Sequence, residues 1–174
     1  SSQSSCEWLV MGWDGRSHSG IFVTNPIGWL LANIDSNLAL FKDKGVRHVG
    51  KVLLALRPGR KDRNFIEIAQ KVCSFYGAAL TLLHVVPEST TSSTIFDMEK
   101  KSSSKLESNT LKSEVSIVKS DDPVGTISGL SASYDLLILG TPEKDNWINV
   151  LFGGGKDEFT EQAACSVLRL TVKD

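Results

Sequence analysis

This chain of 174 residues has no large excess of positive or negative charge, no long apolar run and no secretion signal. Its 19 Lys and Arg are balanced by 20 Asp and Glu, so a uniformly basic surface for nucleic acid is excluded. No apolar run approaches the roughly 20 residues that a membrane-spanning helix needs. Residues 1–5 lack the basic flank and apolar core of a signal peptide. We therefore expect no nucleic-acid partner and no direct insertion into a membrane.

Cysteine is also scarce, with Cys6, Cys73 and Cys165 lying far apart. They form no CxxC pair and no Cys/His spacing that suits zinc, so we expect no metal and a reducing compartment, the cytoplasm. Catalytic patterns are missing too, because no Gly-x-Ser-x-Gly elbow or acid–base pair is present. His84 lies within an apolar strand and is interpreted as a core histidine. The chain is therefore predicted not to be an enzyme.

Apolar strands alternate with amphipathic helices along most of the sequence, which is typical of parallel sheets with right-handed crossovers. Residues 88–113 are Ser/Thr-rich and predict a loosely attached helix, and residues 42–50 are interpreted as a linker. Strands are expected at residues 8–12, 37–41, 51–56, 79–86, 114–119, 135–140 and 167–172. Helices are expected at about 25–34, 62–75 and 157–164, and another begins at Asp122-Pro123 with an apolar stripe of Val124, Ile127 and Leu130.

The two ends of the chain resemble each other. Residues 7–12 match 134–140, and residues 37–43 match 168–174. Gly12 and Gly140, which end the first pair of segments, are 128 positions apart. Asp43 and Asp174, which end the second pair, are 131 positions apart. We therefore predict two domains. Residues 1–45 would be the C-terminal part of an incomplete first copy, a partial βαβ unit, and residues 46–174 a complete second copy.

The second copy resembles a universal stress protein domain. The resemblance is carried by the strand at residues 51–56, by residues 76–87 (YGAALTLLHVVP), by Asp122-Pro123, by residues 135–140 (DLLILG) and by residues 164–168 (ACSVL). It implies an α/β fold with a five-stranded parallel sheet in the order 3-2-1-4-5 and helices on both faces. Ligands of such sheets bind at the carboxyl ends of the strands, at the switch point between the first and fourth strands.

Members of that family that bind ATP carry an Asp after the first strand and a Gly-x2-Gly-x9-Gly-Ser/Thr loop after the fourth. Here Arg57 stands near the Asp position, Glu143 replaces the second Gly, and Gly154 replaces the Ser/Thr. The segment Gly153-Gly154-Gly155-Lys156 nevertheless offers backbone amides and a cation just before the helix expected at residues 157–164. The candidate anion or nucleotide site comprises Arg57, Val86, Gly140, Gly153, Gly154, Gly155 and Lys156.

Two interpretations of this site stay open. It could be an altered anion site, or a solvated basic loop beside a glycine loop. No cofactor is required by either, and ATP, AMP or a cyclic nucleotide are the candidate ligands.

The pattern Met11-Gly12-Trp13, with Phe41-Lys42-Asp43 after a helix, is similar to tandem universal-stress copies appended to membrane transporters. Those transporters are of the cation–chloride cotransporter, amino-acid permease or cation/proton antiporter type. The resemblance implies a non-catalytic regulatory and dimerisation module on the cytosolic face of such a transporter. The expected partners are the transporter portion of a parent chain and a second copy, paired through the last strand at Val167 to Val172. A nucleotide-binding stress sensor is the alternative.

Overall fold

The computed structural model describes residues 7–13, 36–57, 62–106, 112–140 and 157–172. The strands are β1 (Trp8–Gly12), β2 (Asn37–Lys42), β3 (Lys51–Ala55), β4 (Ala79–Val86), β5 (Ser113–Lys119), β6 (Leu136–Gly140) and β7 (Ser166–Thr171). The helices are α2 (Asp62–Tyr76), α3 (Ser92–Leu106), α4 (Pro123–Ser131) and α6 (Glu158–Gln162). The expected helix at residues 25–34 lies outside the described residues.

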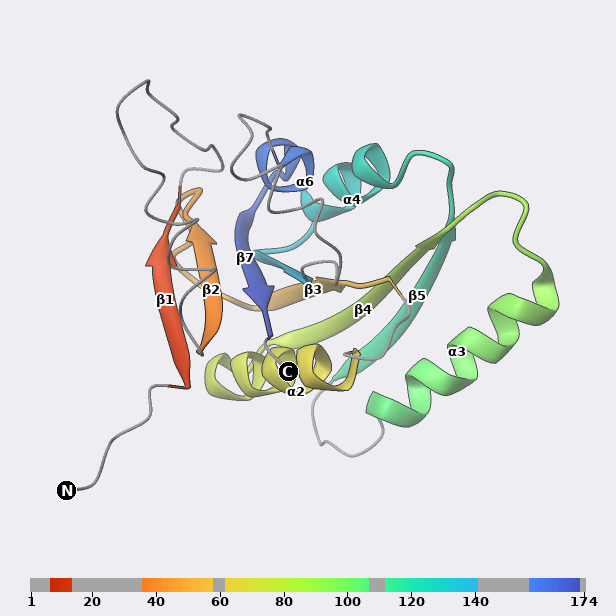
Figure 1. Cartoon of the computed structure of the whole chain (residues 1–174), viewed down its shortest axis with the longest axis horizontal. Helices are drawn as coiled ribbons and strands as arrows, with labels where there is room; N and C mark the ends of the chain where they lie inside the picture. Colours follow the sequence, from red (N-terminus) through yellow and green to blue (C-terminus); the bar gives the residue numbers. More distant parts are fainter. Residues whose placement is uncertain (1–6, 14–35, 58–61, 107–111, 141–156, 173–174) are drawn as a thin grey trace.

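The seven strands within the described residues form one mixed sheet in the order β1-β2-β7-β6-β3-β4-β5 (Figure 1). The five strands expected to form a parallel sheet in the order 3-2-1-4-5 are therefore not a separate sheet but part of this larger mixed one. Strands β5, β4, β3, β6 and β7 do run parallel to one another, but β7 continues into an antiparallel pairing with β2. β1 then pairs with β2 in parallel.

This arrangement also corrects the position of the last strand. β7 is bonded to β6 on one side and to β2 on the other, so it is not an edge of the sheet. Val167 to Val172 was expected to pair with a second copy, but both sides of β7 are already used within the chain. The two outer strands of the sheet are β1 and β5.

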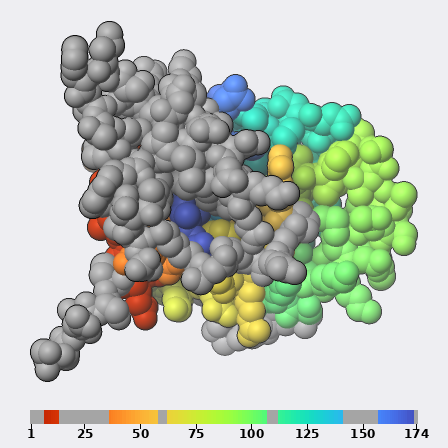
Figure 2. Space-filling view, in the orientation of Figure 1, coloured from red at the N-terminus to blue at the C-terminus, as the bar shows by residue number. Residues whose placement is uncertain are grey.

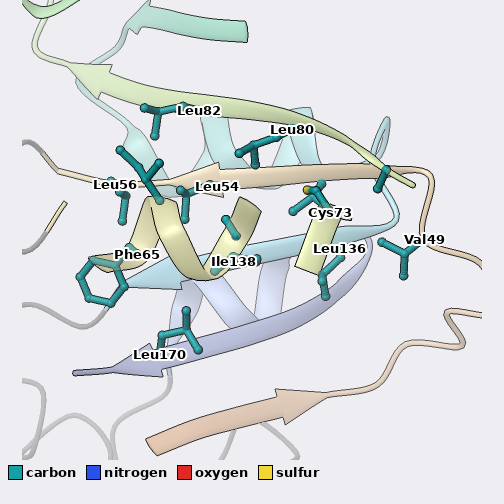
Figure 3. Packing of buried hydrophobic residues seen from close by; sticks show 14 of the residues in the cluster. Val49, Leu54, Leu56, Phe65, Cys73, Leu80, Leu82, Leu136, Ile138 and Leu170 are labelled. Atoms are coloured by element: carbon teal, nitrogen blue, oxygen red, sulfur yellow. The ribbon is translucent and has the colours of Figure 1, made fainter. Parts of the chain in front are cut away.

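Helices cover both faces of the sheet. On one face α2 buries Phe65, Ile66, Ala69 and Cys73 against residues of β3, β4, β6 and β7, and Figure 3 shows this packing. On the other face Ile127 of α4 and Ala163, just after α6, pack against Leu53, Leu137 and Val167. Strands covered on both sides carry apolar residues without alternation, which explains the continuous apolar runs of β3 and β6.

Local signals in the sequence set the helix ends. The side chain of Asp122 accepts a hydrogen bond from Gly125 N at 2.9 Å, and Pro123 follows it at the start of α4. After α2, Gly77 adopts a φ of +68°, a left-handed conformation that costs glycine little.

Residues 43–49 are tied down, although the sequence suggested only a linker. Asp43 Oδ1 accepts hydrogen bonds from Gly45 N at 2.8 Å and Val46 N at 3.2 Å, and these amides lower the pKa of its carboxyl. Lys44 donates from its backbone N to Ser166 Oγ at 2.8 Å and from its ammonium to the carbonyl oxygens of Glu161 and Ala163. The segment after β2 is thereby fixed to the turn between α6 and β7.

Candidate functional site

The carboxyl ends of β3, β4 and β6 meet at one edge of the sheet, where the candidate site was expected. β3 lies between β4 and β6, with Ala55 level with Leu83 and Leu139. The edge thus brings together three of the predicted site residues: Arg57 follows β3, Val86 ends β4 and Gly140 ends β6. Arg57 is exposed and Val86 is buried. The other four, Gly153, Gly154, Gly155 and Lys156, lie outside the described residues.

Gly140 lies against two apolar side chains. A β-carbon placed on Gly140 would lie 3.0 Å from Cε2 of Phe65 and 3.1 Å from Cδ2 of Leu56. Both side chains are buried, and Figure 3 shows them beside the end of β6. The space next to Gly140 on the α2 face is therefore filled by the protein itself. The helical periodicity of residues 62–75 cannot show that the Phe65 ring reaches Gly140.

His84 is a core histidine, as the sequence indicated. Its ring is 2% exposed, with Nδ1 3.0 Å from the carbonyl oxygen of Leu56 and Nε2 2.8 Å from Oγ of Ser102. A carbonyl oxygen only accepts, so Nδ1–H donates to Leu56 and the Ser102 hydroxyl donates to Nε2. Burial lowers the pKa of His84, so the ring stays neutral.

The same cluster attaches α3 to the rest of the fold. Ser102 and Leu106 are the buried residues of α3, and Lys105 forms an ion pair with Asp62 at 3.3 Å. A helix with a thin apolar stripe is thus held partly by polar contacts. His84 thus links the two sides of this attachment, with Nε2 bonded to Ser102 of α3 and Nδ1 bonded to Leu56 just after β3.

A second buried polar contact joins the start of α6 to β7. Nε of Arg169 lies 3.2 Å from Oδ2 of Asp157, and the two side chains are 11% and 5% exposed. Thr160 Oγ1 also donates to Asp157 Oδ2, at 2.7 Å. Burial lowers the pKa of Arg169, and Asp157 opposes that shift. This pair was not predicted from the sequence, although a charged residue inside the apolar segment 167–172 was an available signal.

Neither a metal centre nor a membrane span is found in the described parts of the chain. Within them no three His, Cys, Asp or Glu side chains are grouped so as to hold a metal ion. No helix there is long and apolar enough to cross a membrane. Burial raises the pKa of the Cys73 thiol to about 11 and raises that of Cys165 as well, which is contrary to what a reactive cysteine requires.

Comparison with solved structures identifies the fold of the chain. No family model matches the chain, and no curated protein matches it. Among solved structures, a universal stress protein from Archaeoglobus fulgidus DSM 4304 has a TM-score of 0.66 at 15% identity, over 97% of this chain and 62% of that one. A universal stress protein in complex with cAMP has a TM-score of 0.59 at 14% identity, over 72% of this chain and 99% of that one. The Archaeoglobus fulgidus universal stress protein in complex with dAMP has a TM-score of 0.54 at 11% identity, over 71% of this chain and 98% of that one.

The chain therefore has the α/β fold of universal stress proteins. It spans 62% of the length of the longer Archaeoglobus fulgidus protein. Residues 51–171, which hold the five mutually parallel strands, carry the switch point of this fold between β3 and β6.

The described residues offer little to a nucleotide at that switch point. On the α2 face Phe65 and Leu56 occupy the space beside Gly140, and the residue after Leu56 is a cation, Arg57, in place of a carboxylate. A ligand that enters here has to displace the Phe65 ring or approach Gly140 from the other face of the sheet.

Proposed function

We propose that this chain is a non-catalytic regulatory domain of the universal stress type. It comprises one complete unit, residues 46–174, and the C-terminal part of a second unit, residues 1–45. The observation that supports it most is the packing of buried Phe65 and Leu56 against Gly140, which fills the α2 side of the switch point. With that space filled on the α2 face, we expect the domain to act through its surfaces.

The pairing of strands supports the two-unit organisation. Val10 pairs with Ala39, and Ile138 pairs with Leu168, in the same parallel sense. Val10 and Ile138 are 128 positions apart, and Ala39 and Leu168 are 129 apart. The strand register thus relates β2 to β7 by 129 positions, two fewer than the 131 positions given by the second sequence match. Between the units, β2 and β7 run antiparallel, which is the relation expected across a local two-fold axis.

The coverage of the solved structures agrees with this organisation. About seven-tenths of the chain accounts for nearly the whole of the shorter universal stress proteins, and nearly the whole chain accounts for 62% of a longer one. One complete unit and part of another would give these proportions.

We place the domain on the cytosolic face of a membrane transporter. Support comes from the proposed tandem arrangement and from the resemblance of residues 11–43 to copies appended to transporters. An antibody raised against this chain tests the placement on fractionated source cells. Detection of a larger protein in the membrane fraction is expected, and a protein of 19.0 kDa confined to the soluble fraction would contradict it.

Binding of an adenine nucleotide is the second candidate, because two solved structures with this fold are complexes with cAMP and dAMP. A thermal-shift panel of ATP, AMP and cAMP tests it. A nucleotide at 100 times its dissociation constant stabilises the folded state by about 2.7 kcal/mol. The loss of such a shift in Arg57→Ala, but not in the exposed control Arg63→Ala, would place the ligand at the end of β3. No shift with any nucleotide removes this candidate.

The absence of catalysis is tested by a phosphate-release assay with ATP. We expect no release of phosphate from ATP above the rate without protein. Turnover that Arg57→Ala abolishes would contradict the non-catalytic assignment.

A further inference from the structure

β1 has the sequence of a central strand and the surroundings of an edge strand. Its residues Trp8–Gly12 (WLVMG) carry no charge and no proline. Yet Val10, at its centre, is 65% exposed, whereas Ile138, the corresponding residue of β6 in the proposed two-unit organisation, is 0% exposed. Natural edge strands are usually protected by charges, proline or bulges, and β1 has none of these.

The missing neighbour of β1 can be deduced from β6. β6 has β7 on one side and β3 on the other, and both run parallel to it. β1 has β2 on the side that corresponds to β7, and β2 also runs parallel to it. On its second side no strand of the described residues pairs with it, and Figure 1 shows β1 as the outermost strand there.

The backbone of β1 is oriented to accept such a neighbour. The carbonyl of Glu7 accepts from Asn37 N at 3.0 Å, and Trp13 N donates to the carbonyl of Phe41 at 2.8 Å. In a strand, alternate residues direct their N–H and C=O groups to opposite sides. Odd-numbered residues from 7 to 13 therefore bond to β2, and Val10 and Gly12 direct their groups to the open side.

The opposite edge of the sheet differs. β5 carries Glu114 and Lys119, and α3 packs beside it. Glu114 also accepts a hydrogen bond from Thr81 Oγ1 at 3.0 Å. Charges of this kind discourage pairing with another chain, so of the two outer strands among the described residues β1 is the one suited to a partner.

We propose that β1 is the acceptor for one more parallel, apolar strand, equivalent to β3, which is the first strand of a universal-stress unit. The proposal rests on the two-unit organisation proposed above. The register of β3 on β6 sets the register of the incoming strand, because Leu54 lies opposite Ile138. The strand would come from a polypeptide segment that completes the unit to which β1 and β2 belong.

The test uses the whole chain, labelled with ¹⁵N, and a capped peptide with the sequence of residues 46–56 as the probe. Binding should perturb the amides of Val10 and Gly12 and leave those of Leu9 and Met11, which already bond to β2, nearly unchanged. Exchange of the Val10 amide with solvent should slow by at least about tenfold. A nitroxide on the amino end of the peptide should broaden Trp8 more than Gly12, because the strands are parallel.

Two variants control for surface effects. Val10→Lys adds an edge charge at a solvent-exposed side chain and should abolish peptide binding. Phe96→Lys changes a side chain of similar exposure, 66%, on α3, and should bind the peptide as the wild type does. Figure 2 shows the α3 region (green) on the far side of the molecule from β1 (red).

Three results would overturn the proposal. One is the absence of any amide perturbation, and another is broadening that indicates an antiparallel peptide. The third is self-association of the chain without peptide that Val10→Lys abolishes, since a second copy would then be the occupant of this edge. None of these results bears on the membrane fractionation or the nucleotide panel, so this proposal and the proposed function fail separately.

Discussion

Oδ2 of Asp157 lies 3.2 Å from Nε of Arg169, and the two side chains join the start of α6 to the middle of β7. The contact is an ion pair and not an aligned hydrogen bond, because Nε has no hydrogen-bond partner. Loss of one member of a buried pair leaves the other charge uncompensated. We expect Asp157→Ala and Arg169→Met each to lower the free energy of unfolding by about 3–5 kcal/mol, as measured in urea.

The double variant is the control for this pair. With both charges removed, the loss should be clearly smaller than the sum of the two single losses. Additive losses would show that the two side chains do not interact.

Gly140 and Gly12 offer a matched pair of substitutions, because they end β6 and β1 at corresponding places. A β-carbon at Gly140 meets Phe65 and Leu56 at 3.0–3.1 Å, whereas one at Gly12 has nothing within 4 Å. We expect Gly140→Ala to lower the free energy of unfolding by about 1–3 kcal/mol through overpacking. Gly12→Ala should change it by less than about 0.5 kcal/mol. Equal effects would mean that the space beside Gly140 is open.

His84 should make stability depend on pH. Its pKa is lowered on folding by burial, so the unfolded chain takes up a proton that the folded chain resists. Stability is therefore full above the ordinary value of about 6.5 and falls as the pH drops below it. Asp62 and Lys105, the charged groups that affect this ring, act in opposite directions.

The check is a series of urea unfolding curves between pH 5 and pH 8. His84→Gln should flatten the loss of stability on the acid side, and His48→Gln, at an exposed position, should leave it as in the wild type. A loss that persists unchanged in His84→Gln would assign the acid sensitivity to other groups.

The buried cysteines should resist modification. The pKa of Cys73 is raised to about 11 by burial, and its side chain is 0% exposed. In a Cys6→Ser variant at pH 8, we expect a disulfide reagent to react with Cys73 and Cys165 only as fast as the protein opens. Reaction at the rate of a free thiol in the native protein would contradict the buried positions of both.

The local elements follow closely from the sequence because apolar runs, proline and glycine act over short distances. The expected strand at residues 79–86 coincides with β4, and Asp122-Pro123 does begin α4. α3 was expected to be loosely attached since its apolar stripe is thin. The bonds that hold it, from Ser102 to His84 and from Lys105 to Asp62, join residues that periodicity does not relate.

The pairing of β2 with β7 was harder to anticipate than the order of the five strands from β5 to β7. The pairing of β2 with β7 depends on where two distant segments meet, and nothing in the local pattern of either strand specifies an antiparallel neighbour. The candidate site illustrates the same limit. Spacing placed Gly140 at the switch point, but the contact with Phe65 depends on how α2 lies across the sheet.

The antiparallel contact between β2 and β7 is the most direct test of the account, because it joins the two proposed units. Leu40 faces Arg169 in that ladder, and Ala39 and Phe41 face Leu170 and Leu168. Nuclear Overhauser spectra of the whole chain should show short Hα–Hα contacts from Ala39 to Leu170 and from Phe41 to Leu168, within one molecule. Their absence, together with contacts between the β7 strands of two differently labelled copies, would contradict it.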